Sequence, residues 1–507
     1  MTEPTIYVAS AGTGKTTALM DELEIALKKT TPSTVIYTTF TNAGATEASQ
    51  RAMARFPEHN ESMFRFFRTL HSIAYRSIPN RKMMGMGDYI ELGKELGLFI
   101  NAKRAMSSVD GTVGAEFSLG DKLLHLDSLK RLKRCSWEEI KTQQENSHFS
   151  AQDIETFSDN YRAFRKKQRV YDFTDQLELL LEQLQSGEWF QRITHLFVDE
   201  AQDLSNLQWA IIEEFSKLAD KVVIAGDDKQ AIYGFSGGEP NSLINRKGER
   251  RILETSYRLP KKLLKFSETV AERIQQKQDY ICISPNEGGE VSYVWGLSEL
   301  DLSSGTWMIL VRNRKFLEYF EYELDRLSIN YTSASGNSTV DPDLIECILQ
   351  WNQMILGYPI EGRVIKIIYT KFLRGSDTVK RGFKAGIQFI EDDEGFTLRD
   401  LQNDHGLVAD GPWSSVFALP EQTLETVKRL EDAGELEENP RVHLATIHGV
   451  KGKEADNVVV LPDMAPMTHK NFANNPDDEH RVFYVAVTRA RSKLFLHQPI
   501  TDMFYPL

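Results

Sequence analysis

Residues 5–28 constrain the fold of this chain more than any other stretch. The apolar run at residues 5–8 is typical of a short buried strand, and it leads directly into the loop ASAGTGKT at residues 9–16. Residues 17–28 then carry leucines at helical spacing. A strand, a small-residue loop that ends in Lys-Thr, and a helix form the phosphate-binding unit of α/β proteins. The sequence therefore predicts an α/β fold with a phosphate-binding loop.

The residue types in this loop suit a nucleotide phosphate. Gly12 and Gly14 allow backbone N–H groups to turn inward around a phosphate at a helix N-terminus. Lys15 supplies a positive charge for the outer phosphates, and the Thr16 hydroxyl is a ligand for Mg²⁺. The alternative is a glycine-rich turn that only caps a helix, and the strand and helix on either side favour the phosphate site.

Two adjacent carboxylates, Asp199 and Glu200, end a second apolar run at residues 193–198. Central strands of open α/β sheets end in this way where their carboxyl ends face a ligand. One carboxylate can hold Mg²⁺ and its neighbour can activate a water molecule beside a phosphate. The alternative is an acidic helix N-terminus, where Asp and Glu suit the helix dipole.

A third apolar run, at residues 221–226, ends in the polar cluster DDKQ and is followed by a loop that carries Tyr233 and Phe235. We expect the polar cluster at the same edge of the sheet as Asp199. Aromatic side chains on such a loop can stack on nucleic-acid bases. From the residues alone, a local hydrophobic plug is the favoured interpretation of the two rings.

Size and composition limit the class of protein. The 507 residues predict about three or four domains, and 41% hydrophobic and 26% charged residues are typical of a globular protein. The first residues lack the layout of a secretion signal, no apolar run could span a bilayer, and the three cysteines are widely spaced. We expect a soluble, cytoplasmic protein without membrane contact. The net charge of −13 still allows a local basic groove.

Two strand-poor stretches interrupt the α/β pattern. Residues 79–188 are predicted to form a helical insertion, with basic clusters at 130–134 and 162–169. These clusters could follow a phosphate backbone, but each alone is more typical of a solvated helix face. A second insertion is predicted at residues 340–439.

Seven motifs occur in the order found in superfamily 1 DNA helicases of the UvrD/Rep type, and the chain resembles a compact member of that family with reduced accessory insertions. The motifs are ASAGTGKT, TTFTNAGA (38–45), VDEAQDLSNLQ (198–208), GDDKQAIYGF (226–235), LETSYR (253–258), ATIHGVKGKEADNVVVL (445–461) and YVAVTRAR (484–491).

The resemblance implies two RecA-like, parallel-sheet P-loop domains, each with a mainly helical inserted subdomain. The first domain would comprise residues 1–78 and 189–252, interrupted by the helical insertion at 79–188. The second would comprise residues 253–339 and 440–507, interrupted by the reduced accessory insertion at 340–439. ATP and Mg²⁺ would bind between the two domains.

The resemblance also implies roles for individual residues. Thr16 and Asp199 would hold Mg²⁺, Glu200 would be the general base, and Gln230 would sense the outer phosphate. Arg258 and Arg489 would come from the second domain as arginine fingers. The ATP-binding residues would be Ala11, Gly12, Thr13, Gly14, Lys15, Thr16, Thr17, Tyr257 and Glu454. The DNA-binding residues would be Phe40, Thr41, Asn42, His71, Phe235, Thr446 and His448.

Two departures from the family pattern concern the ends of the chain. Only seven residues precede Val8, where the family carries an adenine-reading glutamine, so Tyr257 would carry more of the adenine contact. Only ten residues follow His497, where relatives place a strand-separating hairpin. We expect a minimal pin built from Phe504 and Tyr505, or no pin.

The function that the resemblance implies is a DNA-dependent ATPase that moves on single-stranded DNA, 3′ to 5′, and unwinds duplex or displaces bound protein. Its partners would be single strands, single-strand–duplex junctions, and a replication, repair or defence protein. One alternative is a DNA-gated ATPase switch without productive unwinding. Another is a small-molecule phosphotransferase, which would not need two arginine fingers.

Overall fold

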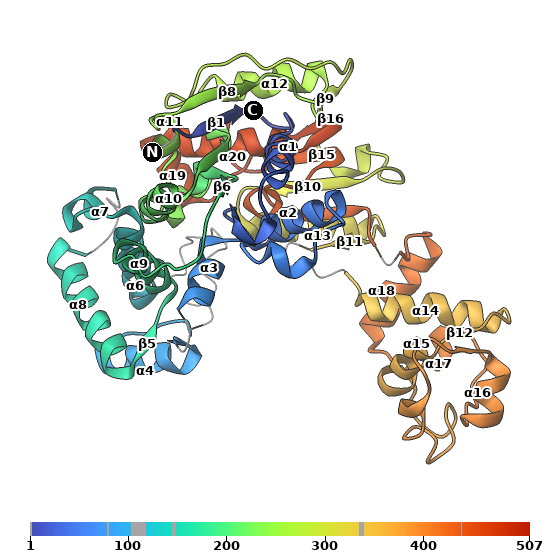
Figure 1. The fold of residues 1–507 in the computed structure, drawn as a ribbon. Helices are drawn as coiled ribbons and strands as arrows, with labels where there is room; N and C mark the ends of the chain where they lie inside the picture. Colours follow the sequence, from blue (N-terminus) through green and yellow to red (C-terminus); the bar gives the residue numbers. More distant parts are fainter. Residues whose placement is uncertain (1–2, 79–80, 103–117, 144–148, 334–338, 438) are drawn as a thin grey trace.

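The computed structural model describes residues 3–78, 81–102, 118–143, 149–333, 339–437 and 439–507. Two six-stranded sheets organise this chain, with strand orders β3-β2-β6-β7-β1-β8 and β11-β14-β10-β15-β16-β9. Every strand pair within these two sheets is parallel. The structure therefore confirms the predicted α/β class with two parallel sheets (Figure 1).

The first sheet is covered by helices on both faces. Its strands are β1 (Thr5–Ala9), β2 (Val35–Thr38), β3 (Phe67–Arg68), β6 (His195–Val198), β7 (Lys221–Gly226) and β8 (Glu249–Leu253). Its helices include α1 (Lys15–Leu27), α2 (Asn42–Arg55), α3 (Leu70–Ser77), α10 (Asn206–Leu218) and α11 (Pro240–Ile244). Alternate residues of β1 enter different cores, Tyr7 on one face and Ile6 and Val8 on the other. This two-sided burial explains why the strands are continuous apolar runs.

The second sheet packs in the same way and shares a core with the first half of the chain. Its strands are β9 (Glu290–Val294), β10 (Trp307–Val311), β11 (Tyr331–Thr332), β14 (Val442–Thr446), β15 (Ala455–Leu461) and β16 (Ala490–His497). Its helices include α12 (Lys261–Ala271), α13 (Leu317–Arg326), α19 (Pro466–Asn474) and α20 (Pro476–Val487). Ala11, Ile232 and Tyr233 belong to the same buried cluster as Leu259 and Tyr484. The two halves are therefore packed against each other.

The helical insertion has a core of its own, which runs from Met84 to Val170. It contains β4 (Lys82–Met83), α4 (Met86–Leu96), α6 (Leu119–Lys133), α7 (Trp137–Gln143), α8 (Ala151–Gln168) and β5 (Val170–Tyr171). The next helix, α9 (Phe173–Gln185), buries four leucines in the core of the first sheet instead. We therefore propose that the first domain resumes at α9, within the range 79–188 assigned to the insertion.

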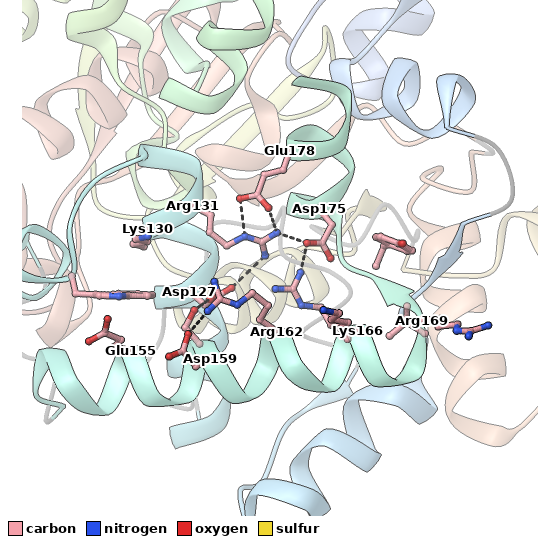
Figure 2. Close-up of a pocket in the computed structure, with 15 residues that line it drawn as sticks. Asp127, Lys130, Arg131, Glu155, Asp159, Arg162, Lys166, Arg169, Asp175 and Glu178 are labelled. Atoms are coloured by element: carbon pink, nitrogen blue, oxygen red, sulfur yellow. Dashed lines mark hydrogen bonds and ion pairs between the residues drawn. The ribbon is translucent and has the colours of Figure 1, made fainter. Parts of the chain in front are cut away.

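A buried charge network joins α6, α8 and the start of α9 (Figure 2). Arg131 donates to Asp172 at 2.8 Å, to Asp175 at 2.6 Å and to Glu178 at 2.7 Å, and Arg165 also pairs with Asp175. Burial raises the pKa of Asp172, but the two guanidinium groups beside it hold that pKa below its ordinary value. Each basic cluster therefore contributes one arginine, Arg131 or Arg165, to the interior of the insertion, while other members such as Arg162 face solvent.

Four members of this network line a cavity of about 550 Å³, namely Arg131, Arg165, Asp175 and Glu178 (Figure 2). Its basic and acidic residues largely neutralise one another, because Arg131 contacts four carboxylates and Arg162 pairs with Asp159. The cavity is a structural feature of the insertion.

The accessory insertion is a separate small body that extends away from the two sheets in Figure 1. It contains α14 (Pro342–Ile355), β12 (Ile360–Glu361), α15 (Gly362–Ile367), β13 (Gly395–Phe396), α16 (Leu398–Asp404), α17 (Trp413–Val416) and α18 (Glu421–Asp432). Its core, around Trp351 and Trp413, draws only on residues of this insertion. None of the described helices is both long enough and apolar enough to cross a membrane.

The last residues belong to the core, which corrects the expectation of a pin that includes Tyr505. The Tyr505 ring is fully buried and stacks on Phe483 with ring centroids 4.2 Å apart. Its hydroxyl lies 2.8 Å from Nδ1 of His480. Of the two residues expected to form the pin, Phe504 is the exposed one, at 39%. Removing the residues after His497 would therefore disturb the core as well as any pin.

We predict that Arg131→Ala lowers the free energy of unfolding of the helical insertion by about 3–5 kcal/mol, because the substitution leaves the buried Asp127 without its ion-pair partner and Asp172 and Asp175 with Arg165 alone. Hydrogen exchange of α6 and α8 would measure the change. The control is Arg162→Ala, because the Arg162 side chain is 74% exposed and forms a surface ion pair with Asp159, so the effect should stay within about 0.5 kcal/mol. Equal protection in the Arg131 variant and the wild type would contradict the stabilising role of the network.

Candidate nucleotide site between the two sheets

The loop between β1 and α1 has the backbone geometry that phosphate binding requires. Gly12 and Gly14 have φ angles of 72° and 81°, in the left-handed region that favours glycine. The Thr13 hydroxyl donates to the carbonyl oxygen of Ser10 at 2.9 Å and closes the loop. Lys15 begins α1, and its Nζ lies 4.0 Å from a carboxylate oxygen of Asp227.

Asp199 and Glu200 lie beside this loop at the carboxyl end of β6. The Thr16 hydroxyl donates to Oδ2 of Asp199 at 3.4 Å, and the Tyr37 hydroxyl donates to the same oxygen at 3.0 Å. Burial, together with the neighbouring Glu200, raises the pKa of Asp199 to about 6. Burial also disfavours ionised Glu200, but Lys15 and other cations lower its pKa below the ordinary value.

The backbone at Glu200 is unusual, because its φ is 52° and it is not glycine. Non-glycine residues in this region carry conformational strain, and such strain gathers at functional sites. The conformation also turns the chain into a short 3₁₀ helix, Ala201–Asp203. The strained position falls on the residue that the sequence assigns as general base.

Asp227, at the end of β7, is a site residue that the sequence reasoning did not assign. It is fully buried and accepts a hydrogen bond from Nε2 of Gln230 at 2.6 Å. Burial raises its pKa to about 6, although Lys15 opposes that rise. Asp227 thus links Lys15 to Gln230. The sequence feature that could have identified Asp227 is the apolar run at residues 221–226, which ends in carboxylates as the run before Asp199 does.

Arg489 reaches this cluster from the second sheet, where it precedes β16. Its Nη2 donates to Oε1 of Gln230 at 3.0 Å, and Nε donates to the carbonyl oxygen of Val485 at 2.9 Å. The side chain also donates to the Lys453 carbonyl and the Thr488 hydroxyl. Arg489 is 1% exposed and, among the described residues, has no carboxylate within ion-pair distance. A buried cation of this kind requires an anion for full stabilisation.

Arg258 and Glu454 pair with each other at the mouth of the site. Glu454 also accepts from Nη2 of Arg491 at 2.6 Å, so two guanidinium groups occupy the carboxylate that the resemblance assigns to the ribose. Tyr257 is 68% exposed, which leaves its ring free to stack on a base. Thr17 follows Thr16 in the first turn of α1, and Ala11 is fully buried in the shared core.

The side chains fit a magnesium nucleotide. The Thr16 hydroxyl and Asp199 carboxylate are oxygen ligands of the kind that Mg²⁺ prefers, and they lie in contact. Lys15 lies beside Asp227, Arg489 donates to Gln230, and Gln230 donates to Asp227, so the two positive charges lie at the same cluster. The donor set thus matches a polyphosphate that carries a divalent cation.

Four rings form a continuous row next to the site. Phe40 packs on Tyr233 with centroids 4.8 Å apart, Tyr233 lies 5.9 Å from Phe235, and Phe235 lies 5.6 Å from His448 of the second domain. Tyr233 is the buried member, as expected of a plug, while Phe235 and His448 are half-buried. The structure brings three of the predicted DNA-binding residues together through Tyr233.

The other predicted DNA-binding residues lie at element ends. The Thr41 hydroxyl caps α2 by accepting from the Gly44 amide at 3.1 Å, and Asn42 accepts from Thr69 at 3.4 Å. His71 lies in α3, and burial lowers its pKa to about 4, so the ring is neutral near pH 7. Thr446 ends β14 and accepts from the Gly449 amide at 3.3 Å.

Lys451 is a further residue that the sequence reasoning did not single out. It follows His448 in the second domain, yet it pairs with the buried Asp203 of the first and donates to the Gln230 carbonyl at 2.6 Å. Gln202 joins Asp203 to Glu200 by hydrogen bonds to both carboxylates. A chain of polar contacts therefore connects the aromatic row to the carboxylates beside the phosphate loop.

Comparisons with known proteins match segments in both halves of the chain. Residues 1–250 match the family described as UvrD/REP helicase N-terminal domain, and residues 420–498 match the UvrD-like helicase C-terminal domain. The chain is similar to the ATP-dependent DNA helicase PcrA of Staphylococcus epidermidis, with 21% identity over 99% of this chain and 82% of the relative. It is similar to the ATP-dependent DNA helicase Rep of Buchnera aphidicola, with 21% identity over 97% of this chain and 90% of the relative. DNA helicase II of Haemophilus influenzae is 25% identical over 68% of this chain and 48% of its own length.

We predict that Asp227→Asn raises the free energy of unfolding by about 1–3 kcal/mol at pH 7.5 and by less at pH 4.5. The folded-state pKa of Asp227 is about 6, above the ordinary carboxyl value, so the folded chain loses stability as pH rises and this group ionises. Asparagine removes that cost, which exists only above the unfolded-state pKa. Urea unfolding at the two pH values, without nucleotide or metal, would measure the gain.

The matched control is Asp220→Asn, because Asp220 lies just before β7 and forms an exposed ion pair with Arg192; this substitution should change stability by no more than about 0.5 kcal/mol. A loss of stability in the Asp227 variant at both pH values would contradict the assignment of Asp227 as a buried carboxylate whose ionisation destabilises the fold.

Proposed function

The chain belongs to the UvrD/REP helicase family, and from this premise we propose that it is an ATP-dependent translocase on single-stranded DNA that moves 3′ to 5′ and unwinds duplex or displaces bound protein. The observation that carries the proposal is the composite site. Residues of the first sheet and Arg489 of the second meet at Gln230, next to a row of rings that spans both halves. Hydrolysis and strand binding therefore occupy one interface.

The chain's own residues have distinct roles in this proposal. Lys15 and the loop amides bind the phosphates, and Thr16 with Asp199 holds the cation. Bound Mg²⁺ polarises the phosphates and offsets their charge. Glu200 orients a water molecule and accepts its proton, a role for which its lowered pKa keeps it ionised. Gln230 and the two arginines, Arg258 and Arg489, stabilise the charge that develops on the outer phosphate.

The base and sugar contacts follow the resemblance. Tyr257 has the exposure needed to stack on adenine. The proposed role of Glu454 at the ribose requires that its contact with Arg258 or Arg491 be exchanged. We propose that this exchange accompanies nucleotide binding.

We propose that DNA binds along the aromatic row. Phe40, Phe235 and His448 would stack on or support bases, and Thr41, Asn42, His71 and Thr446 would contact the backbone around them. Movement of either half would change the spacing between Phe235 and His448. Lys451, three residues after His448, would carry that change to Asp203 and so toward Glu200.

One observation favours a second candidate function, a DNA-gated ATPase switch without productive unwinding. The expected pin loses Tyr505, which is part of the core. Phe504 alone is a small wedge for strand separation. A strand-displacement assay on substrates with 3′ or 5′ overhangs separates the two candidates and gives the direction of movement.

We predict that single-stranded DNA stimulates ATP turnover by at least about 10-fold, because strand binding and the charge of Arg489 share one interface. Steady-state phosphate release with and without an oligonucleotide would measure the stimulation, with duplex DNA of equal length as the control. Equal turnover in all three conditions would rule out the translocase.

We predict that Glu200→Gln lowers turnover by about 10²–10⁴-fold and leaves ATP binding nearly intact, because the amide cannot accept the proton of the attacking water. Lys15→Ala should instead lose most of the ATP affinity. Turnover and equilibrium binding of a fluorescent ATP analogue would separate the two effects. Near wild-type turnover by the Glu200 variant would assign the general base elsewhere.

A further inference from the structure

The segment that carries Arg258 is attached to the first sheet. β8 is an edge strand of that sheet and pairs with β1 up to Leu253, opposite Ala9. The next residues continue in extended form, because Ser256 donates its backbone N–H to Ile283 at 2.8 Å and Ile283 donates to Glu254 at 2.7 Å. Arg258 follows only five residues after the end of β8. The next residue, Leu259, is buried in the core that the second sheet shares with Ala11 and Tyr233.

This segment is hydrogen-bonded directly to the phosphate loop. The Ser256 hydroxyl, which is fully buried, donates to the carbonyl oxygen of Ala11 at 2.8 Å. The Tyr257 amide donates to the carbonyl oxygen of Gly12 at 2.9 Å. The Ser256 hydroxyl also accepts from the Leu259 amide at 3.3 Å, so it fixes the turn in which Arg258 lies.

The phosphate loop and the segment that carries Arg258 are also closely packed. A Cβ atom placed on Gly12 would lie 2.3 Å from Cβ of Arg258 and 3.1 Å from the Ser256 hydroxyl oxygen. The backbone of Arg258 thus rests on the phosphate loop itself. By contrast, Arg489 is held by the second-domain carbonyls of Val485 and Lys453, and among the described residues its hydrogen bond to the first half of the chain goes to Gln230, just after β7.

We propose that Ser256 is a positioning residue that fixes Arg258 to the phosphate loop, so that Arg258 moves with the first sheet. This inference rests on the proposed ATPase function and changes one expectation drawn from the resemblance, in which both arginines approach from the second domain. Arg258 then contributes to nucleotide binding whether or not DNA is bound. Arg489 alone supplies the charge that depends on the approach of the second sheet.

Two backbone carbonyl groups of the phosphate loop hold the segment that carries Arg258 in place. Ala11 and Gly12 present these oxygens toward Ser256 and Tyr257, which donate to them. Loss of the Ser256 hydroxyl leaves the buried Ala11 oxygen without this donor and releases the turn. The guanidinium of Arg258 would then be held only by its pairing with Glu454, at the far end of the side chain.

Binding of a fluorescent ATP analogue to the full chain tests the proposal. Ser256→Ala should weaken affinity by about 5- to 30-fold, both without DNA and with a saturating oligonucleotide. Ser267→Ala is the matched control, because Ser267 is equally buried and donates to the Leu264 carbonyl at 2.8 Å in the neighbouring helix. It should leave affinity unchanged. Ser256→Thr, which keeps the hydroxyl, should restore most of the affinity.

A double-mutant cycle with Arg258→Ala separates positioning from general damage. If Ser256 acts through Arg258, the Ser256→Ala effect should shrink to less than about twofold in the Arg258→Ala background. An undiminished effect in that background, or wild-type affinity in Ser256→Ala, would overturn the inference while leaving the proposed function in place. A wild-type chain that binds no ATP would overturn both.

Discussion

The contact between Arg489 and Gln230 is the interaction on which the rest of the site depends. It joins the two sheets through a buried guanidinium that has only neutral oxygens as partners among the described residues. Such a group is stable only near an anion. Lys15, Asp199 and Glu200 are the other charged groups of this site. A polyphosphate would offset the positive charges of Lys15 and Arg489, and its bound cation would offset the negative charges of the two carboxylates.

The same interface explains why strand binding and hydrolysis would be coupled. Gln230 lies three residues before Tyr233, and Lys451 lies three residues after His448. The same two short stretches of chain therefore carry residues of both the aromatic row and the charged site. Lys451 binds Asp203 and the Gln230 carbonyl together. A change in spacing between the halves alters both sets of contacts. No long-range pathway is required, because each step is a direct contact.

The sequence predicted the features that depend on local pattern. Strand and loop spacing located Lys15 and Asp199 correctly at one sheet edge, because parallel strands present their carboxyl ends together. Features that depend on distant partners were not predictable. The cluster that contains Arg131 resembles a solvated helix face until Asp172 is placed opposite it, and Tyr505 resembles a free end until Phe483 stacks on it. The hydrogen bond between Ser256 and the phosphate loop was not predicted, because a single serine gives no sequence pattern that identifies its hydrogen-bond partner.

The central claim is that the second sheet completes the hydrolytic site through Arg489. ATP turnover of Arg489→Lys at saturating single-stranded DNA tests it most directly, because lysine keeps the buried charge but lacks the forked donors. The account predicts a fall in turnover of about 10³-fold in a chain that stays folded, with a loss of unfolding stability of about 1–3 kcal/mol from the donors that lysine lacks, and little change in turnover for Arg491→Lys at the exposed neighbouring pair. Turnover of Arg489→Lys within about threefold of the wild type would contradict the account.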